Sequence, residues 1–333
     1  MRMSKRTIVF FACVVFAVIA LVRGGALEAM ALSKRVYAGG FPIAMVFDID
    51  GAVIDEVGVV KTAAGDATLA NKLRRGDTIT KIDGVKVAGC DEVVSTVEGG
   101  DGDEITLTLI RDGKETTANV TPYIDSDSGL FKLGIYIRDT ISGVGTVTYV
   151  RENGYFGALG HQIVDGVAGS AVPLLGGKVY NCDIVGITKG KRNEAGELRA
   201  TIKGEPIGEI YSNLEAGVFG RFFDFVPQTE LLSLGARSSA LPGKAYIITT
   251  VGDGPVTYEV DIIRALSQNE PTPKGLLLRV TDRRLLAASG GIVQGMSGSP
   301  IIQNGKIVGA VTHVLVADPT KGYGIYTDWM QSA

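Results

Sequence analysis

The sequence predicts a mainly β protein of two domains, the second of which is a closed β-barrel or a β-sandwich. Its 333 residues exceed the roughly 150 that one domain usually takes, so two hydrophobic cores are expected. Glycine occurs 45 times, about twice the usual ~7%, which indicates many tight turns. Short runs between these turns alternate apolar and polar residues, as half-buried strands do, and in the second half of the chain only residues 227–234 suggest an amphipathic helix of any length.

The N-terminus, residues 1–31, is predicted to be an export signal or a membrane anchor. Three basic residues precede an uncharged apolar run over residues 8–22, which is shorter than the ~20 residues that a spanning helix prefers. The Ala-Met-Ala sequence at 29–31 has the form of a signal cleavage site, whereas a retained anchor held by Arg23 is the alternative. In both cases the rest of the chain is expected outside the cytoplasm, because the positive flank stays inside.

Charge and metal-ligand content argue against two classes of function. The net charge is −3 and basic residues occur only in short pairs, so the chain lacks the electrostatic footprint of a nucleic-acid-binding protein. His161 and His313 are the only histidines, and no two of them and the cysteines Cys13, Cys90 and Cys182 have the spacing of a zinc site. We therefore expect no nucleic-acid partner, no metal and no cofactor.

The first predicted domain covers residues 36–123 and contains short strands with one helical insertion. Residues 105–110 alternate strictly, and an Asp-Gly pair at 112–113 then leads into a second strand, so a hairpin is expected. Upstream, residues 70–85 have the pattern of a helix end stopped near Gly76, a short strand and a second Asp-Gly turn.

The run that begins at Ala70 fits A-x-x-L-x-x-G-D-x-I-x-x-I-D-G and so resembles the PDZ domain of exported proteases. This resemblance implies a groove that binds a peptide C-terminus or an internal segment. Backbone N–H groups of a glycine turn would hold the carboxylate, and the peptide would join the edge of the next strand. A plain glycine turn before a strand is the alternative. The residues predicted for this loop are Gly39, Gly40, Phe41, Pro42 and Ile43.

An Asp-rich segment, residues 125–129, interrupts the pattern and predicts the start of the second domain, residues 124–333. It lacks the spaced ligands and distal glutamate of a calcium loop, so a solvated linker is expected. The alternating runs that follow are separated by turns at short intervals, which favours a closed or sandwiched β domain.

The most informative segment is Gly295-Met296-Ser297-Gly298-Ser299-Pro300. Small residues around a serine let the backbone turn sharply, expose the hydroxyl and aim successive N–H groups at one point, which makes an oxyanion hole. The segment resembles the G-D-S-G-S-P turn of trypsin-like peptidases, with Met296 in place of the acid. This likeness implies Ser297 as the nucleophile and the N–H groups of Gly295 and Ser297 as oxyanion donors. A Gly/Ser turn between strands without a catalytic role is the alternative.

A nucleophilic serine needs a general base, and the two histidines are the only imidazoles. His161 follows a predicted strand and precedes a glycine-rich loop, as a base presented at a strand end would. His313 lies inside the alternating run 308–314, which predicts a place in the wall of the domain. We therefore predict His161 as the base, with His313 as the alternative.

Three longer motifs narrow the resemblance to one family. They are F-K-L-G-I-Y-I-R-D-T-x-x-G-V-G-T-V-T from Phe131, G-A-L-G-H ending at His161, and the run from Gly290 through Ser297 to the G-Y-G-I at 322–325. Together they resemble the stage IV sporulation protein B family, PDZ-containing serine peptidases of spore-forming Firmicutes. The resemblance implies export to the space between the two sporulation membranes and self-cleavage. It also implies cleavage of a membrane-bound regulator, which activates processing of a late mother-cell sigma factor.

The family resemblance maps the third member of the triad to Asp282, fifteen residues before Ser297. A carboxylate in this role would fix the tautomer of the base and stabilise the imidazolium. A helix cap is the alternative role for Asp282. The other carboxylates that we consider for the triad are Asp165, Asp183 and Asp224.

The sequence therefore predicts an exported serine endopeptidase with a regulatory PDZ domain, acting on a protein substrate at a membrane surface. The alternative is a catalytically silent PDZ adaptor, whose second domain only binds a partner. A general periplasmic quality-control protease is disfavoured, because those enzymes place their PDZ domains after the protease domain. The oligomeric state is not predicted.

Overall fold

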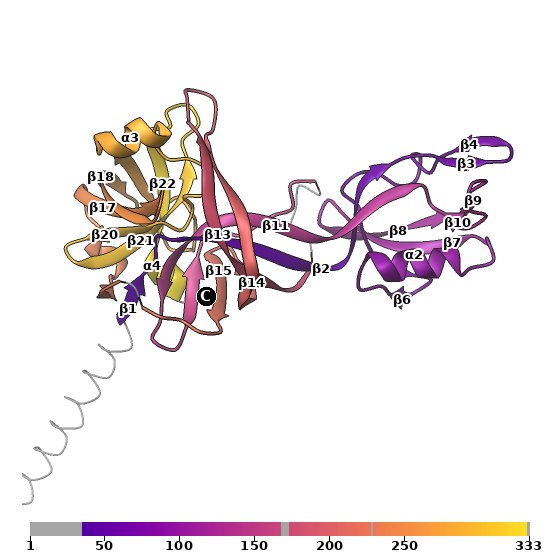
Figure 1. The fold of residues 1–333 in the computed structure, drawn as a ribbon, viewed down its shortest axis with the longest axis horizontal. Coiled ribbons are helices and arrows are strands. Elements are labelled where there is room, and N and C mark those ends of the chain that lie inside the picture. Colours follow the sequence, from indigo (N-terminus) through magenta and orange to yellow (C-terminus); the bar gives the residue numbers. More distant parts are fainter. Residues whose placement is uncertain (1–34, 168–172, 228, 332–333) are drawn as a thin grey trace, which may run out of the picture.

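The structure is a computed structural model that describes residues 35–167, 173–227 and 229–331. A large β body and a smaller lobe lie at opposite ends of the molecule and are joined by two long strands (Figure 1). The predicted mainly β architecture is confirmed. The predicted signal or anchor, residues 1–31, lies outside the described residues, and no helix within them is long and apolar enough to cross a membrane.

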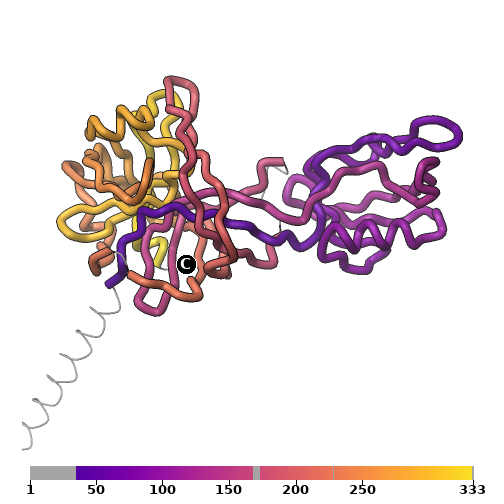
Figure 2. The backbone as a smooth tube through the Cα atoms, in the orientation of Figure 1, coloured from indigo at the N-terminus to yellow at the C-terminus, as the bar shows by residue number. Residues whose placement is uncertain are grey.

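The two connecting strands are β2 (Pro42–Val57) and β11 (Ile135–Val150), which pair with each other in antiparallel fashion along most of their length. In β2, Ile43, Met45, Phe47 and Ile49 are buried in a core of the body, whereas Ala52 and Ile54 are buried in the core of the lobe. The lobe is therefore an insertion between two neighbouring strands of the body (Figure 2).

This insertion differs from the predicted boundaries at 36–123 and 124–333. The start of β2 is hydrogen-bonded on both sides inside the body, to β11 and to β13 (Leu174–Thr188), so it belongs to the second domain and not to the first. Alternation of apolar residues indicated that these strands exist. It carries no information about which distant strand each one pairs with.

The lobe contains one helix and eight short strands besides the end of β2 and the start of β11. They are β3 (Val60–Thr62), β4 (Gly65–Ala67), β5 (Thr78–Ile82), β6 (Val85–Lys86), α2 (Cys90–Glu98), β7 (Ile105–Arg111), β8 (Lys114–Val120), β9 (Tyr123–Ile124) and β10 (Phe131–Lys132).

The predicted hairpin is confirmed, because β7 and β8 pair in register across Asp112 and Gly113. Both turn residues have positive φ, 50° and 74°, as a two-residue type I′ turn requires. Helix α2 lies against the lobe and buries Val93 and Val97 in its core. The lobe therefore has a hydrophobic core of its own, as a domain does.

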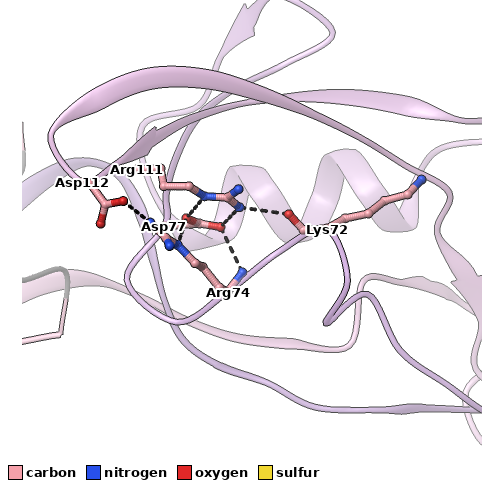
Figure 3. A network of polar contacts seen from close by, with 5 residues as sticks. All are labelled: Lys72, Arg74, Asp77, Arg111 and Asp112. Carbon is pink, nitrogen blue, oxygen red and sulfur yellow. Dashed lines mark hydrogen bonds and ion pairs between the residues drawn. The ribbon is translucent and has the colours of Figure 1, made fainter.

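Asp77, the acidic residue of the motif that resembles a PDZ domain, is fully buried and paired (Figure 3). The Nε and Nη2 atoms of Arg111 donate to its two oxygens at 2.7 and 2.6 Å, and the Arg74 amide donates at 3.0 Å. The same Arg111 guanidinium also donates to the Lys72 carbonyl at 2.9 Å. The Asp77 carboxylate therefore balances the charge of Arg111 inside the lobe. The hydrogen bonds between them attach β7 to the loop before β5.

The body consists of two closed β-barrels. In the first, pairing runs β2, β11, β12, β15, β14, β13 and back to β2. In the second it runs β17, β18, β19, β22, β21, β20 and back to β17. Closure removes exposed strand edges, and each barrel encloses its own apolar core.

The remaining elements of the first barrel are β12 (Tyr155–Ala158), β14 (Glu197–Leu214) and β15 (Gly217–Phe222). Those of the second barrel are β17 (Gly243–Thr250), β18 (Pro255–Ala265), β19 (Leu276–Val280), α3 (Arg283–Ser289), β20 (Pro300–Gln303), β21 (Lys306–Val314), β22 (Lys321–Tyr326) and the terminal helix α4 (Thr327–Gln331). A short 3₁₀ helix, η1 (Arg237–Ser239), precedes β17.

Two short strands join the barrels. β1 (Arg35–Ala38) pairs with β11 of the first barrel and with β16 (Leu231–Leu234), and β16 pairs with β21 of the second. The suggestion of a helix at 227–234 was therefore wrong for 231–234. Ladder hydrogen bonds from both sides hold this stretch extended, and tertiary pairing overrides the local pattern.

Candidate active site

Ser297 lies in the turn between α3 and β20, where the two barrels meet. Its carbonyl accepts the Thr146 amide of the first barrel at 2.8 Å, and the next amide, that of Gly298, donates to Val311 of the second at 2.7 Å. The Ser297 hydroxyl donates to the Thr312 carbonyl at 2.6 Å. The predicted nucleophile is therefore held by backbone contacts to both barrels, and a strand follows it, as predicted.

The predicted oxyanion donors, the amides of Gly295 and Ser297, make no hydrogen bond to any other described residue. The amide between them, that of Met296, donates to the Val293 carbonyl at 3.2 Å. The Gly295 carbonyl is held from the other side by the Thr146 hydroxyl at 2.8 Å, and Gly295 has a φ of +95°. Two alternate amides are thus left able to bind an oxyanion.

A hairpin of the first barrel supports this turn from outside. The tip between β13 and β14 lies against the chain that leads to Ser297, because the Gln294 amide donates to the Gly196 carbonyl and the Leu198 amide donates to the Gln294 carbonyl, at 2.8 and 2.9 Å. The Leu198 side chain is buried in the core of the second barrel. The oxyanion turn is therefore fixed by contacts from both barrels.

His161 lies beyond the end of β12, after two residues of positive φ, Leu159 (65°) and Gly160 (70°). A Cβ at Gly160 would lie within 3.0 Å of side-chain atoms of Ile325 and Thr312, so this turn of the first barrel packs closely on β21 and β22 of the second. The predicted position at a strand end is confirmed.

The two histidines face each other across the junction, with ring centroids 4.9 Å apart and planes tilted by 42°. His313 lies in β21, as predicted, directly after Thr312, whose carbonyl accepts the Ser297 hydroxyl. The structure therefore brings Ser297, His161 and His313 into one cluster built by both barrels.

The electrostatics favour His161 over His313 as the base. The Nδ1 atom of His161 lies 2.9 Å from the Gln162 carbonyl, an acceptor, so Nδ1 carries the proton and Nε2 is left with a lone pair. Burial lowers the pKa of His161. Burial, and then the charges of His161 and Lys274, lower the pKa of His313 to about 4, and its Nδ1 is buried without a hydrogen bond to any described residue.

The structure does not bring Asp282 to His161. Its carboxylate accepts the Arg284 amide at 2.9 Å and the Glu259 amide at 3.3 Å, and pairs with the Arg284 guanidinium at 2.7 Å. The Arg284 hydrogen bonds lower the pKa of Asp282 to about 2. Among the described residues, Asp282 makes no hydrogen bond to His161. In this structure Asp282 caps α3, and it does not hold the triad position that the family resemblance implies.

The other three carboxylates that were considered also have different surroundings. Asp165 is buried, pairs with Arg138 and accepts the Val167 amide at 2.8 Å. Asp183 pairs with Lys203. Asp224 lines a cavity of about 690 Å³ beside Phe222 and Phe225.

The contact that sequence reasoning missed is that of Asn213, at the end of β14. Its Oδ1 accepts the Ile163 amide and its Nδ2 donates to the Ile163 carbonyl, both at 2.8 Å. The Gln162 side chain donates in turn to the Asn213 carbonyl at 3.4 Å. No local pattern marks an asparagine fifty residues after the histidine loop, because the contact depends on the closure of the barrel.

The loop predicted to bind a peptide carboxylate, Gly39 to Ile43, lies in the body and not in the lobe. The amides of Gly39 and Gly40 donate to the carbonyls of Thr148 and Val147 at 3.0 and 2.8 Å. The strand that follows is paired on both sides. The amides of both glycines are engaged and the strand offers no free edge to a peptide, so this placement of the site was wrong.

The features expected of that loop occur instead at the start of β11. Gly134, with a φ of +66°, precedes a segment that pairs with β2 on one side, and a cavity of about 350 Å³ separates its other side from α2. Val93 and Val97 of α2 line this cavity opposite Ile135. The signal was present in the L-G-I at 133–135, which has the glycine turn and the apolar strand in the expected order.

Among the described residues, no three His, Cys, Asp or Glu side chains are grouped so that they could hold a metal ion.

One curated relative is the "Putative zinc metalloprotease mll0638" of Mesorhizobium japonicum, 30% identical over 100 residues that cover 30% of this chain. This chain spans about a quarter of that relative, 27%. Among solved structures, the active form of the Rv3671c protease from M. tuberculosis is 14% identical, covering 58% of this chain and 72% of that one with a TM-score of 0.35. The HtrA-type protease AlgW with a tripeptide is 14% identical, covering 57% and 56%, with a TM-score of 0.35.

Two family models match the chain. A PDZ domain model matches residues 41–121, and the model of SpoIVB peptidase S55 matches residues 129–331, well over half of the 333 residues. The second match contains His161, Asn213 and Ser297, whereas β1 and the body half of β2 precede it in the chain. The chain belongs to the SpoIVB peptidase S55 family of serine peptidases, and its PDZ domain is inserted into the catalytic body.

Proposed function

We propose that this protein is a serine endopeptidase in which Ser297 is the nucleophile and His161 the general base. The observation that carries the proposal is the arrangement of the barrel junction, where Ser297 bonds the Thr312 carbonyl, the ring of His161 faces the adjacent His313, and two amides of the serine turn are unengaged by described residues. His161 holds its proton on Nδ1, so Nε2 is the nitrogen that can accept a proton from a hydroxyl.

The reaction follows from these roles. A χ1 rotation turns the Ser297 hydroxyl from the Thr312 carbonyl toward Nε2 of His161, which takes the proton as Oγ attacks the peptide carbonyl. The amides of Gly295 and Ser297 stabilise the oxyanion. Collapse of the intermediate breaks the C–N bond, and the proton passes from Nε2 to the leaving amine. A water molecule, activated in the same way, then hydrolyses the acyl-enzyme and restores Ser297.

A fluorophosphonate probe tests the proposal, because it reacts only with an activated serine. Wild-type protein should be labelled and Ser297→Ala should not, with both proteins equally folded by circular dichroism. A control variant, Ser299→Ala, removes the other serine of the turn, whose hydroxyl is buried and makes no hydrogen bond to a described residue, and it should keep its labelling. An unlabelled, folded wild type would favour the catalytically silent PDZ adaptor instead.

The family and the lobe support a proposal for the substrate class. We propose a membrane-associated regulatory protein as substrate, self-cleavage, and a role in sporulation signalling that activates processing of a late mother-cell sigma factor. Export through the N-terminal segment to the space between the two sporulation membranes is part of this proposal. In a spore-forming host that lacks its own copy, wild-type protein should restore processing of the sigma factor and Ser297→Ala should not.

The PDZ lobe supplies the partner site in this proposal. A peptide C-terminus or an internal segment would lie between α2 and the start of β11, where the cavity, the glycine turn and the one-sided strand come together. Peptide binding there would recruit the substrate or control its access to Ser297.

A further inference from the structure

The Nδ1 atom of His161 faces a peptide carbonyl. In a serine peptidase triad a carboxylate accepts the Nδ1–H of the histidine and fixes its tautomer. Here that acceptor is the Gln162 carbonyl, 2.9 Å from Nδ1, and Asp282 is engaged by Arg284 and Glu259. In this structure the partner of Nδ1 is therefore a neutral acceptor and not the predicted carboxylate.

Asn213 holds the same peptide group from its other end. The Gln162 carbonyl and the Ile163 N–H belong to one peptide unit, and that N–H donates to Oδ1 of Asn213 at 2.8 Å. The hydrogen bonds therefore run in series from the imidazole through the peptide to the asparagine. Bonds in series polarise one another, so the asparagine strengthens the carbonyl as an acceptor for His161.

Two further contacts fix the orientation of this peptide. Nδ2 of Asn213 donates to the Ile163 carbonyl at 2.8 Å, and the Gln162 side chain donates to the Asn213 carbonyl at 3.4 Å. With both ends of its amide engaged, the Asn213 side chain has one orientation, and the loop has two points of attachment.

Asn213 is itself on a rigid element. It pairs with Val218 in the β14–β15 hairpin of the first barrel. The turn of this hairpin packs closely on the chain before His161, because a Cβ at Gly217 would lie 2.6 Å from the Ala158 carbonyl oxygen and 3.2 Å from the Gly160 nitrogen. The hairpin and the histidine loop therefore cannot shift independently of each other.

We propose that Asn213 is a positioning residue for the peptidase reaction, which acts through the 162–163 peptide to hold the ring of His161 and its tautomer. This inference rests on the proposed function, since it assigns a role in the same reaction. The acceptor that faces Nδ1 in this arrangement is the neutral Gln162 carbonyl.

The first test compares variants by their rate of reaction with a fluorophosphonate across pH. Asn213→Ala should react slower than wild type by on the order of 10²-fold, the cost of a misplaced catalytic group. The matched control is Asn153→Ala, which removes an asparagine with one long side-chain bond, 3.4 Å to the Tyr155 amide, and should react at the wild-type rate. A wild-type rate in Asn213→Ala, or a loss no larger than its unfolded fraction, would overturn the inference.

Asn213→Asp tests whether position 213 is coupled electrostatically to the imidazole. The aspartate keeps an acceptor for the Ile163 amide and adds a negative charge near the imidazole, which favours the protonated ring. The midpoint of the pH–rate profile should therefore shift to higher pH. Among the described residues the titratable ring that faces His161 is that of His313 in β21, whose own pKa Lys274 lowers, and neither residue is altered. An unshifted midpoint would contradict the role.

The second test does not depend on activity. In the Ser297→Ala background, ¹⁵N NMR of the imidazole should show His161 protonated at Nδ1, and Asn213→Ala should convert this to a mixture of tautomers, while Asn153→Ala should not. If the fluorophosphonate does not label the wild type but the Nδ1 tautomer still depends on Asn213, the proposed peptidase activity is contradicted and the positioning role is kept. If the tautomer of His161 is unchanged in Asn213→Ala, only the positioning role is contradicted.

Discussion

Gly298 lies where the two barrels approach each other most closely around the nucleophile. A Cβ there would lie 1.8 Å from the Thr146 carbonyl oxygen and 2.6 Å from the Leu159 nitrogen, and its φ is +100°. Only glycine meets both demands. The residue after the nucleophile is therefore fixed by the contact between the barrels as well as by the sharpness of the turn.

Asp282 is the residue where the geometry changes an expected mutational result. Asparagine can still accept the amides that Asp282 caps, so Asp282→Asn should keep its reaction rate with a fluorophosphonate within a few-fold of wild type. Asp282→Ala loses the cap and should lower the free energy of unfolding by about 1 kcal/mol. Probe kinetics measure the reaction rate of Asp282→Asn, and denaturant unfolding measures the free energy of unfolding of Asp282→Ala. A loss of orders of magnitude in the rate of Asp282→Asn would restore the carboxylate to the triad.

His313 should make the fold sensitive to acid. Its pKa falls from an ordinary 6.5 to about 4 in the folded protein, because burial disfavours the charged ring. The folded state then binds a proton less readily than the unfolded chain, so stability is full above about pH 6.5 and declines as pH falls toward 4.

The melting temperature of wild type should therefore fall more steeply from about pH 7 to about pH 5 than that of His313→Phe, which cannot protonate. Carboxylates titrate in both proteins and cancel in the comparison. Parallel plots of melting temperature against pH for the two proteins would show that protonation of His313 does not destabilise the folded state.

At the scale of elements, the parts predicted from the sequence are those that local patterns determine. The β7–β8 hairpin, the strand position of His313, the nucleophile turn and the strand end before His161 all follow from alternation and turn residues within about ten positions. The path of β2 does not, since the same alternation fits a strand of either domain. The contact of Asn213 with the histidine loop depends on barrel closure, which no local pattern encodes. The same holds for the position of Asp282, which caps α3 and makes no hydrogen bond to His161 among the described residues.

The loop before β5 and strand β7 should depend on Asp77 for their attachment. Replacing Asp77 with alanine leaves the partly buried Arg111 guanidinium unpaired, which should cost the lobe about 3 kcal/mol. Calorimetry should show a lobe transition at lower temperature, with the barrel transition unchanged.

The control for this prediction is Asp112→Asn. Asp112 pairs with Arg74 at an exposed position of the β7–β8 turn, and asparagine tolerates the positive φ there, so the lobe should change by less than about 1 kcal/mol. Equal effects of the two substitutions would show that burial of the Asp77 pair is unimportant.

At the scale of the whole molecule, the proposed peptide groove and the proposed nucleophile lie in separate parts of one continuous sheet. β11 begins beside the cavity of the lobe and, near its other end, provides Thr146, which holds the carbonyls of Gly295 and Ser297. The lobe has its own core, so a change confined to the cavity should leave the nucleophile intact.

Val94→Lys tests this separation, because Val94 lines the cavity and is 45% exposed, so a lysine there adds charge without opening the core. Binding of a fluorescent peptide with an apolar C-terminus should weaken at least tenfold by anisotropy, while the fluorophosphonate rate stays at the wild-type value. Thr117→Lys, on the exposed face of β8, should change neither. Joint loss of binding and labelling would mean that the lobe and the barrels form one site.

The insertion of the lobe also decides what a deletion in this gene would remove. Its two ends lie side by side, with Asp48 opposite Thr140, so a short β-turn grafted between residues 50 and 139 would excise the lobe and leave both barrels closed. A truncation of residues 36–123, which follows the apparent linear order, would instead take away β1 and β2 and open the first barrel. Inactivity of that truncated protein would report a broken enzyme, and would be mistaken for a requirement for peptide binding.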